Sequence, residues 1–241
     1  MKVWITEQDY KTSLVEGLSI DLKKHRVIAA VGAGGKTTFL NQLGKELAAL
    51  GNKVVFTTTT HILQPKENTV LSYQAEEIQA ALQKTPFITV GIPCENGKLK
   101  CDDISHLDNL TRICDFLLIE ADGSRRLPLK APGEKEPVLP SWTDLVVGIA
   151  GASSIGRKLE DVCFRGETAA EILNCSLDHI VTPEDVAFLL NHEGGQKKDV
   201  GTKDYRAVLG QADGVRLEYA KRALHCLRMK NVQSAAISYR N

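Results

Sequence analysis

The chain contains the stretch Gly32-Ala33-Gly34-Gly35-Lys36-Thr37-Thr38, here called the glycine loop, around which the rest of the sequence can be organised. An apolar run at residues 26–31 precedes it, and apolar residues at helical spacing follow over residues 36–50. A strand, a glycine-rich turn ending in Gly-Lys-Thr and a helix, in that order, surround phosphate oxygens with backbone N–H groups at a helix N-terminus. The sequence therefore predicts that the whole loop binds a nucleoside triphosphate, ATP or GTP.

Two side chains of the glycine loop have expected roles beyond those of the backbone. Lys36 is placed to reach the β- and γ-phosphates, and Thr37 to offer its hydroxyl to Mg²⁺. The full phosphate-loop pattern has glycine where this chain has Ala30, so the loop is an abbreviated form. A simple turn with a helix cap is the alternative. A dinucleotide fingerprint is disfavoured because its third glycine would fall at Thr37.

The most apolar strand of the chain ends in two acidic residues. Residues 116–119 lead into Glu120 and Asp122, whose spacing places both carboxylates on the same side of an extended strand. A triphosphate site needs an acid that holds the metal, so we expect Glu120 to bind Mg²⁺ and Asp122 to orient the attacking group. The alternative is that both residues only cap the end of the strand.

A threonine run closes the strand that follows the first helix. Thr57-Thr58-Thr59-Thr60-His61 lies where strand ends face the ligand in doubly wound sheets. Thr59 or Thr60 is therefore a candidate for completing the Mg²⁺ shell, although the β-propensity of threonine also explains the run. His61 is interpreted as a surface residue in preference to a proton carrier.

A long segment at about 122–143 follows the acidic strand and is too rich in proline for a helix or a central strand. Loops of this length inside a compact domain are usually functional. Arg125, Arg126 and Lys130 could clamp an anionic second substrate or the transferring γ-phosphate, with Arg125 as the expected catalytic cation. Arg157 and Arg165 are weaker candidates for the same pocket.

Asp213 is the remaining candidate for the nucleotide site. It ends the run Gly210-Gln211-Ala212-Asp213, which follows an apolar strand where GTPases carry Asn-Lys-x-Asp for guanine. Gly210 and Gln211 replace the asparagine and lysine, so only Asp213 could still pair with a base. A plain loop aspartate is the alternative, and the sequence does not choose between ATP and GTP.

Composition and spacing bound the fold and the partners. The 241 residues are 43% hydrophobic, and apolar runs alternate with helical patterns. We expect a single α/β domain over residues 1–241, with a P-loop NTPase-like, mostly parallel sheet and helices on both faces. Lys plus Arg and Asp plus Glu are equal at 30 each, and no segment resembles a signal peptide or a membrane span. We therefore expect a cytoplasmic protein without nucleic-acid or membrane partners.

Two other segments have structural predictions only. Among six cysteines without a zinc-like pattern, Cys94 and Cys101 flank the turn-rich residues 95–98, which predicts a hairpin that brings them together as neighbours. Residues 193–203 are polar and glycine-rich, which is typical of a mobile surface loop.

Taken together, the motifs resemble those of the YqeC family. The resemblance is carried by the glycine loop, the threonine run 57–61, the stretch Glu120-Ala-Asp-Gly-Ser-Arg-Arg-Leu-Pro-Leu-Lys-Ala-Pro132 and the stretch Glu136-Pro-Val-Leu-Pro140, in this order. It covers most of the chain and fades after about Leu190, so residues 191–241 match less well. The resemblance implies a P-loop NTPase fold and an accessory role in maturing selenium-dependent molybdenum hydroxylases. It implies as partner a molybdenum hydroxylase or a cofactor-biosynthesis client.

Three functions are compatible with these motifs. The first is an NTP-hydrolysing maturation factor, with the triphosphate on Lys36, Mg²⁺ near Thr37 and Glu120, and a client or labile cofactor at residues 122–140. The second is a ligase or kinase that activates a small acid, because the glycine loop and the threonine-rich strand also resemble the ATP site of Mur-type ligases. No segment here corresponds to the separate substrate and C-terminal domains of those ligases. The third is a non-catalytic switch whose nucleotide state controls partner binding.

Overall fold

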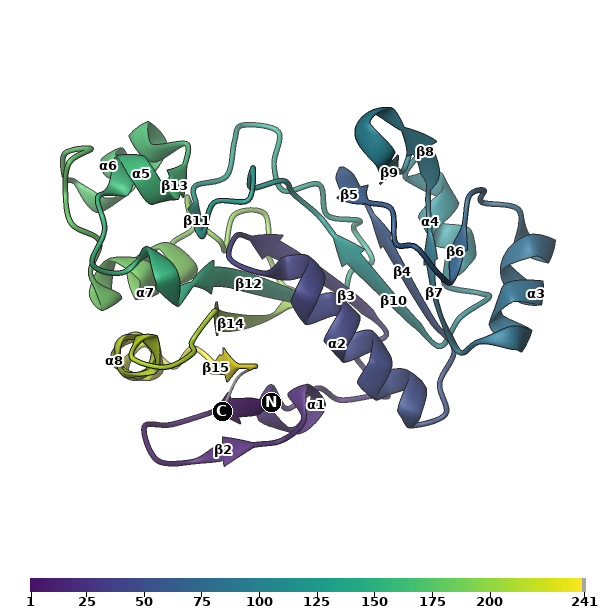
Figure 1. The fold of residues 1–241 in the computed structure, drawn as a ribbon, viewed down its shortest axis with the longest axis horizontal. Coiled ribbons are helices and arrows are strands. Elements are labelled where there is room, and N and C mark those ends of the chain that lie inside the picture. The colour runs from purple at the N-terminus through teal and green to yellow at the C-terminus, as the bar shows by residue number, and fades with distance from the viewer. Residues whose placement is uncertain (240–241) are drawn as a thin grey trace.

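The structure is a computed structural model that describes residues 1–239, and a ten-stranded sheet forms the centre of this part of the chain (Figure 1). From one edge to the other, the strands are β2 (Tyr10–Lys11), β1 (Lys2–Trp4), β15 (Ser234–Ser238), β14 (Asp204–Gly210), β12 (Leu145–Gly151), β3 (Val27–Gly32), β10 (Phe116–Glu120), β4 (Val54–Thr58), β7 (Phe87–Val90) and β6 (Thr69–Val70). Neighbours from β15 to β6 are parallel, whereas β1 and β2 join the edge antiparallel.

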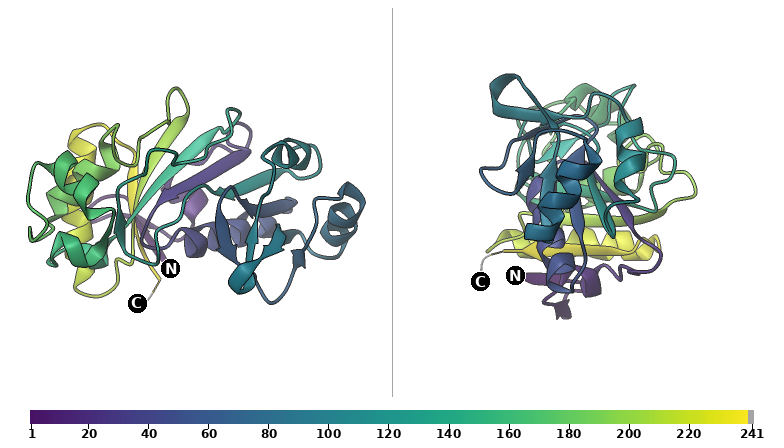
Figure 2. Two further views of the ribbon diagram at one scale, coloured as in Figure 1. Left: turned by 90° about the horizontal axis from the view of Figure 1, so that it is seen from above. Right: turned by 90° about the vertical axis from the view of Figure 1, so that its right-hand side faces the viewer.

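Helices cover both faces of this sheet. One face carries α1 (Leu14–Gly17) and α2 (Lys36–Ala49), and the other carries α3 (Ala75–Lys84), α4 (Ser105–Leu110), α5 (Leu159–Val162), α6 (Gly166–Leu173), α7 (Pro183–Asn191) and α8 (Arg216–Met229). Figure 2 shows α5 to α8 gathered toward one end of the sheet and α3 at the other. The strands are buried on both faces, which is why β3, β10 and β12 appear in the sequence as continuous apolar runs.

The predicted fold class is confirmed: the protein is α/β, with a large, mostly parallel sheet and helices on both faces, consistent with a P-loop NTPase-like fold. The strands predicted before the glycine loop, before the two acids, before the threonine run and before Gly210 all lie in this sheet, as β3, β10, β4 and β14. None of the helices in residues 1–239 is long and apolar enough to cross a bilayer.

A small antiparallel sheet lies beside the main one. It is formed by β5 (His61–Leu63), β9 (Lys98–Lys100) and β8 (Ile92–Cys94), and η1 (Glu95–Gly97) is the turn of the predicted hairpin. In its register Cys94 pairs with Lys98, so the hairpin does not make Cys94 and Cys101 cross-strand neighbours. The segment at about 122–143, here called the long loop, is irregular apart from β11 (Leu129–Lys130), which pairs with β13 (Cys163–Phe164).

Residues 193–203 pack on the long loop, and the expectation of a mobile surface loop is wrong for their central part. Gln196 is buried and donates a hydrogen bond to the carbonyl of Lys130 at 2.7 Å. Lys198 Nζ donates to the carbonyls of Gly133, Glu134 and Glu136 at 2.6, 2.7 and 2.8 Å. The segment therefore holds the long loop in place.

Candidate functional site

The glycine loop lies at the carboxyl edge of the central strands. In the sheet register, Glu120 of β10 pairs with Ala30 of β3 on one side and with Thr58 of β4 on the other. Parallel strands end at the same edge, so the loop after β3, the acids after β10 and the threonines after β4 converge there. This is the edge at which open α/β sheets bind ligands.

The backbone of the glycine loop follows a path that only glycine takes without strain. Gly32, Gly34 and Gly35 have φ angles of 95°, 78° and 124°. A Cβ on Gly34 would also lie 2.2 Å from the backbone nitrogen of Gly151, so the loop packs directly against the end of β12. Gly35 caps α2, and no side chain of the described residues bonds the N–H groups of the helix's first turn. These N–H groups form the kind of positive helix end that binds anions.

Lys36 is buried among acceptors at the base of the glycine loop. Its ammonium donates to the Gly32 carbonyl at 2.6 Å and lies 3.1 Å from Asp122 Oδ1 and 3.8 Å from Glu120 Oε1. Thr37 Oγ1 donates to Glu120 Oε2 at 2.6 Å. The structure thus brings together four side chains that the sequence predicts for the site and that come from two distant segments: Lys36, Thr37, Glu120 and Asp122.

The two carboxylates of this cluster are buried, and burial changes the pKa of Glu120. Glu120 is 8% exposed, and its burial raises the pKa of the carboxyl although Lys36 and the Thr37 hydroxyl favour the ionised form. Asp122 is 1% exposed; its Oδ2 accepts from the Gly32 N–H at 2.9 Å. Among the described residues, Asp122 Oδ1 has no hydrogen-bond partner, and its contact with Lys36 is a purely ionic one.

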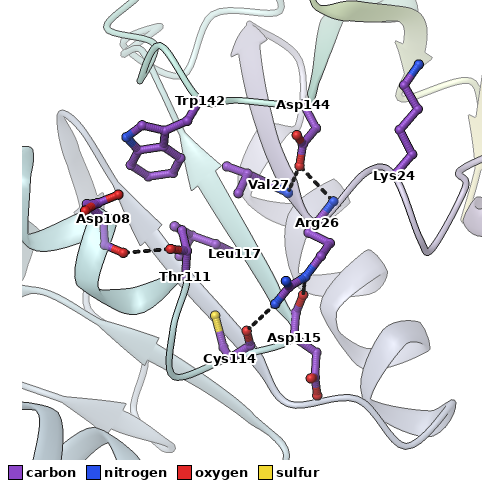
Figure 3. A pocket seen from close by; sticks show the side chains of 10 residues that line it. All are labelled: Lys24, Arg26, Val27, Asp108, Thr111, Cys114, Asp115, Leu117, Trp142 and Asp144. Carbon is purple, nitrogen blue, oxygen red and sulfur yellow. Dashed lines mark hydrogen bonds between the residues drawn. The ribbon is translucent and has the colours of Figure 1, made fainter.

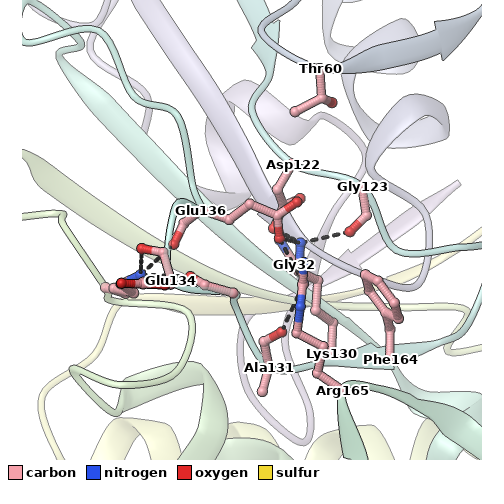
Figure 4. A network of polar contacts seen from close by, with 12 residues as sticks. Gly32, Thr60, Asp122, Gly123, Lys130, Ala131, Glu134, Glu136, Phe164 and Arg165 are labelled. Carbon is pink, nitrogen blue, oxygen red and sulfur yellow. Dashed lines mark hydrogen bonds and ion pairs between the residues drawn. The ribbon is translucent and has the colours of Figure 1, made fainter. Parts of the chain in front are cut away.

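A chain of ion pairs connects this cluster to the long loop (Figure 4). Lys130 Nζ lies 2.8 Å from Asp122 Oδ2 and 2.7 Å from Glu136 Oε2, and it donates to the Gly123 carbonyl at 2.6 Å. Arg165 Nη1 lies 2.7 Å from the same Glu136 oxygen. Burial opposes ionisation of Glu136, but its hydrogen bonds and ion pairs with Lys130 and Arg165 outweigh burial and lower its pKa.

Lys130 does not belong to the clamp for an anion that the sequence suggested. Its side chain is 0% exposed and is surrounded by Asp122, Glu136 and the Gly123 carbonyl. It holds the long loop against the acidic strand. Arg125 and Arg126 remain available for a clamp, since both are exposed at the tip of the loop.

The glycine loop opens into a cleft of about 890 Å³. Lys36, Thr37, Thr38, Thr59, Glu120, Arg125, Arg126 and Arg165 line it, together with Phe164, Lys98 and Gln211. The Thr59 hydroxyl donates to the carbonyl of Val138 at 2.9 Å, so the side chain of this threonine binds the long loop, while its backbone N–H donates to the carbonyl of Glu120 at 3.1 Å. Arg157 is not among the residues that line the cleft.

Asp213 lies in a smaller cavity of about 120 Å³ on the other side of the glycine loop. The two cavities share Gly34, Gly35, Thr38 and Gln211. The smaller one has apolar walls from Phe39, Ile149, Val208 and Ile237, and it also contains Tyr239. Ser238 Oγ donates to Asp213 Oδ1 at 2.9 Å. The structure therefore places Asp213 beside the predicted phosphate site, at the end of β14.

A pocket of about 300 Å³ lies at the opposite edge of the sheet, where β3, β10 and β12 begin (Figure 3). Its polar groups are engaged in holding these strand starts together. Asp144 accepts from the N–H groups of Arg26 and Val27 at 3.0 and 2.8 Å, and the Arg26 guanidinium donates to the carbonyls of Cys114 and Asp115. This pocket is therefore explained by the structure of the sheet alone.

Several residues that build the cleft had no signal in the sequence. Phe164 lies on the two-residue strand β13, which is too short to give a hydrophobic pattern. Lys98 is on β9, which has only three residues, and Gln211 has a positive φ of 57° that its residue type does not predict. Arg165 was only a weak candidate, since its place in the cleft depends on the pairing of β13 with β11.

Comparisons with known proteins show the family to which the chain belongs. Residues 28–167, which contain the glycine loop, the acidic strand and the long loop, match the model of the YqeC protein family. The uncharacterized protein YqeC of Escherichia coli (strain K12) is 35% identical over 193 residues, which cover 76% of this chain and 75% of that protein. The chain therefore belongs to the YqeC family.

Proposed function

We propose that the protein binds a nucleoside triphosphate with Mg²⁺ on the glycine loop and hydrolyses it. The observation that carries this proposal is the position of Lys36, whose ammonium is held between the Gly32 carbonyl, Asp122 and Glu120 at the N-terminus of α2. A lysine buried beside a glycine turn and uncapped helix N–H groups is the arrangement that stabilises the charge of phosphate groups.

The residues present fit a magnesium ion. Thr37 and Glu120, a hydroxyl and a carboxylate, are in direct contact at 2.6 Å, and oxygen ligands are those that Mg²⁺ prefers. No group of three or more His, Cys, Asp or Glu side chains forms a metal cluster in the described part of the chain, so substrate phosphates and water would complete the shell. When bound, Mg²⁺ supplies positive charge that stabilises the phosphate oxygens during phosphoryl transfer.

The two cavities suggest how the nucleotide is oriented. The smaller, mostly apolar cavity suits a flat base, and Asp213 at its wall can accept hydrogen bonds from the edge of the base. The larger cleft contains Lys36, Thr37 and Glu120 and therefore suits the phosphates. In this orientation Arg125 can stabilise negative charge from the open side. Asp122 is buried and does not line the cleft, so it acts by holding Lys36 and not, as the sequence suggested, by positioning the attacking group.

Transfer of the γ-phosphate to a small acid, as in a ligase or kinase, is a second candidate. The volume of about 890 Å³ is within the range of pockets that enclose a whole small molecule, ~300–1,000 Å³, and it extends beyond the glycine loop. An accessory role in maturing selenium-dependent molybdenum hydroxylases is supported by membership of the YqeC family and by the exposed residues of the long loop, such as Arg125 and Arg126, where a client can bind. A nucleotide-dependent switch uses the same site without turnover.

The experiment that tests the binding site is calorimetric titration of ATP, GTP and CTP in the presence of Mg²⁺. Lys36→Ala is expected to weaken binding of the preferred nucleotide by at least about 100-fold, because a charged partner of the phosphates is lost. Lys45→Ala, on the exposed face of the same helix, is the matched control and should bind like the natural protein. Equal binding by both variants would contradict the site.

Turnover is measured separately as phosphate release, with and without a candidate hydroxylase client. Stimulation by the client supports the maturation factor, and formation of a phosphorylated small acid supports the ligase or kinase. Binding without turnover under both conditions supports the switch. Loss of base preference in Asp213→Ala would identify the smaller cavity as the base site.

A further inference from the structure

The cleft continues beyond the part that a triphosphate on the glycine loop would occupy. The glycine loop and Glu120 line its inner part. The rest of the lining, here called the outer half, includes His61 and Leu63 of β5, Lys98 of β9 and the turn from Ser124 to Leu127, which is closed by a hydrogen bond of 3.0 Å between the Leu127 N–H and the Ser124 carbonyl. Apart from Arg125, the residues of this outer half have no role in the proposed nucleotide site.

The outer half has more positive than negative charge. Its acids are already paired: Glu120 contacts Lys36 and Thr37, and Glu136 contacts Lys130 and Arg165. Within residues 1–239, by contrast, neither Arg126 nor Lys98 has a side-chain hydrogen bond or ion pair, and Arg125 only stacks on an aromatic ring. A cleft lined by one sign of charge concentrates ligands of the opposite sign.

The two arginines are presented in an unusual backbone conformation. Arg125 and Arg126 have φ angles of 49° and 65°, a region that residues other than glycine rarely adopt. Such strain is found at ligand clamps, where the surrounding structure maintains it. Here the bond from Lys130 to the Gly123 carbonyl fixes one side of the turn, and the bond from the Gly151 N–H to the Pro128 carbonyl at 2.7 Å fixes the other.

Phe164 orients the guanidinium groups. Arg125 lies 4.9 Å and Arg165 4.3 Å from the centre of its ring. Stacking holds a guanidinium by its flat face and leaves its N–H edge free to bind an anion. That edge matches a phosphate group, which two parallel N–H bonds can hold.

We propose that this outer half of the cleft is a second binding site, for a small molecule that carries a phosphate or diphosphate group, held by Arg125, Arg126 and Lys98. The proposal rests on the proposed function in one respect, because it assigns the glycine loop to the nucleotide and the outer half to the second ligand. Three unpaired cations within one cleft favour a group with at least two negative charges over a single carboxylate.

The test is a calorimetric titration of inorganic pyrophosphate into protein saturated with Mg²⁺ and a non-hydrolysable triphosphate. We expect binding that weakens at least 10-fold in Arg125→Ala/Arg126→Ala. Both side chains are exposed, so this variant should fold normally, which circular dichroism checks. The matched control is Arg112→Ala/Arg157→Ala, two arginines outside the cleft, of which Arg112 is 77% exposed in its side chain. The control should bind pyrophosphate like the natural protein.

Two outcomes would overturn the proposal: pyrophosphate affinity that is unchanged in Arg125→Ala/Arg126→Ala, or malonate, a dicarboxylate, binding as tightly as pyrophosphate. Failure of the nucleotide site is distinguished by repeating the titration on Lys36→Ala without nucleotide. Suppose that the natural protein binds no triphosphate. If Lys36→Ala still binds pyrophosphate, and if adding Arg125→Ala/Arg126→Ala to that variant abolishes pyrophosphate binding, the second site exists without the nucleotide site. If Lys36→Ala binds no pyrophosphate either, both proposals fail.

Discussion

At the scale of single residues, the candidate site depends on buried charges that neutralise one another. Burying an ion costs several kcal/mol unless a partner of opposite charge is close. Lys36 and Lys130 each lie between two carboxylates, and Asp122 is shared by both lysines. This alternation pairs each carboxylate with a cation beside the proposed phosphate site, where unpaired carboxylates would repel the ligand.

Lys130 is therefore expected to be needed for stability. Lys130→Met removes the charge with little change in volume and leaves Asp122 and Glu136 without their common partner. The free energy of unfolding should fall by about 3–5 kcal/mol, as it does when one member of a buried pair is removed. Urea denaturation measures this, with the exposed Lys135→Met as control. A loss of less than about 1 kcal/mol, the range of a surface ion pair, would show that the network does not stabilise the fold.

Sequence patterns could predict one part of the site and not the other. Lys36, Thr37, Glu120 and Asp122 were predictable because each lies at or within a few residues of the end of an apolar strand, and parallel strands bring such positions to one edge. Lys130 was misassigned because a buried and an exposed lysine are identical in sequence. Its burial depends on the pairing of β11 with β13 and on Gln196, which approaches from 66 residues away.

At the scale of elements, the glycine loop is positioned by its contact with β12 as well as by β3 and α2. The Ala33 N–H donates to the Ile149 carbonyl at 2.8 Å, and Gly34 packs against Gly151. A loop held on both sides can present its N–H groups in a fixed arrangement before the ligand arrives, which reduces the entropic cost of binding.

A comparison of Gly34→Ala with Gly35→Ala separates the effect of backbone strain from the effect of packing against β12. Both glycines have positive φ, which costs alanine about 1–2 kcal/mol, but only at Gly34 would the added Cβ meet backbone atoms. Overpacking adds about 1–3 kcal/mol, so Gly34→Ala should be the less stable variant and the weaker nucleotide binder. Thermal melting and calorimetry measure both effects. If the two variants have equal melting temperatures and equal nucleotide affinities, the glycine loop can move away from β12 without loss of stability or binding.

The strands differed in how well the sequence predicted them, for a physical reason. β3, β10 and β12 are buried on both faces, so the apolar run extends over the whole strand. The elements β5, β8, β9, β11 and β13 are two or three residues long, and tertiary contacts determine where they form. Those short strands carry or position Lys98, Phe164 and Arg165, so the outer half of the cleft could not be predicted.

At the scale of the whole molecule, the site is assembled from segments that are far apart in the chain. The glycine loop comes from the first quarter, the acids and the long loop from the middle, and β14 and β15 contribute to the walls of the smaller cavity that we propose for the base. Residues 196 and 198 connect these parts, because they bind the carbonyls of Lys130, Gly133, Glu134 and Glu136. The segment after Leu190 thus supports the long loop directly.

This support predicts that Lys198→Ala loosens the long loop without disturbing the sheet. In the natural protein the Glu136 N–H is bonded to the Gly133 carbonyl and the Val138 N–H to the Ala121 carbonyl, so both amides are protected from exchange. A hydrogen bond to a charged group stabilises by about 1.5–3 kcal/mol, so losing the Lys198 contacts should accelerate exchange of both amides at least ~10-fold. Hydrogen exchange measured by NMR reports this, and amides of β10 should stay protected. Lys197→Ala, which removes only a surface ion pair with Glu193, should leave the long loop unchanged. If both variants exchange like the natural protein, the Lys198 contacts are not needed to hold the long loop, and its other contacts, including that of Gln196 with the Lys130 carbonyl, are sufficient.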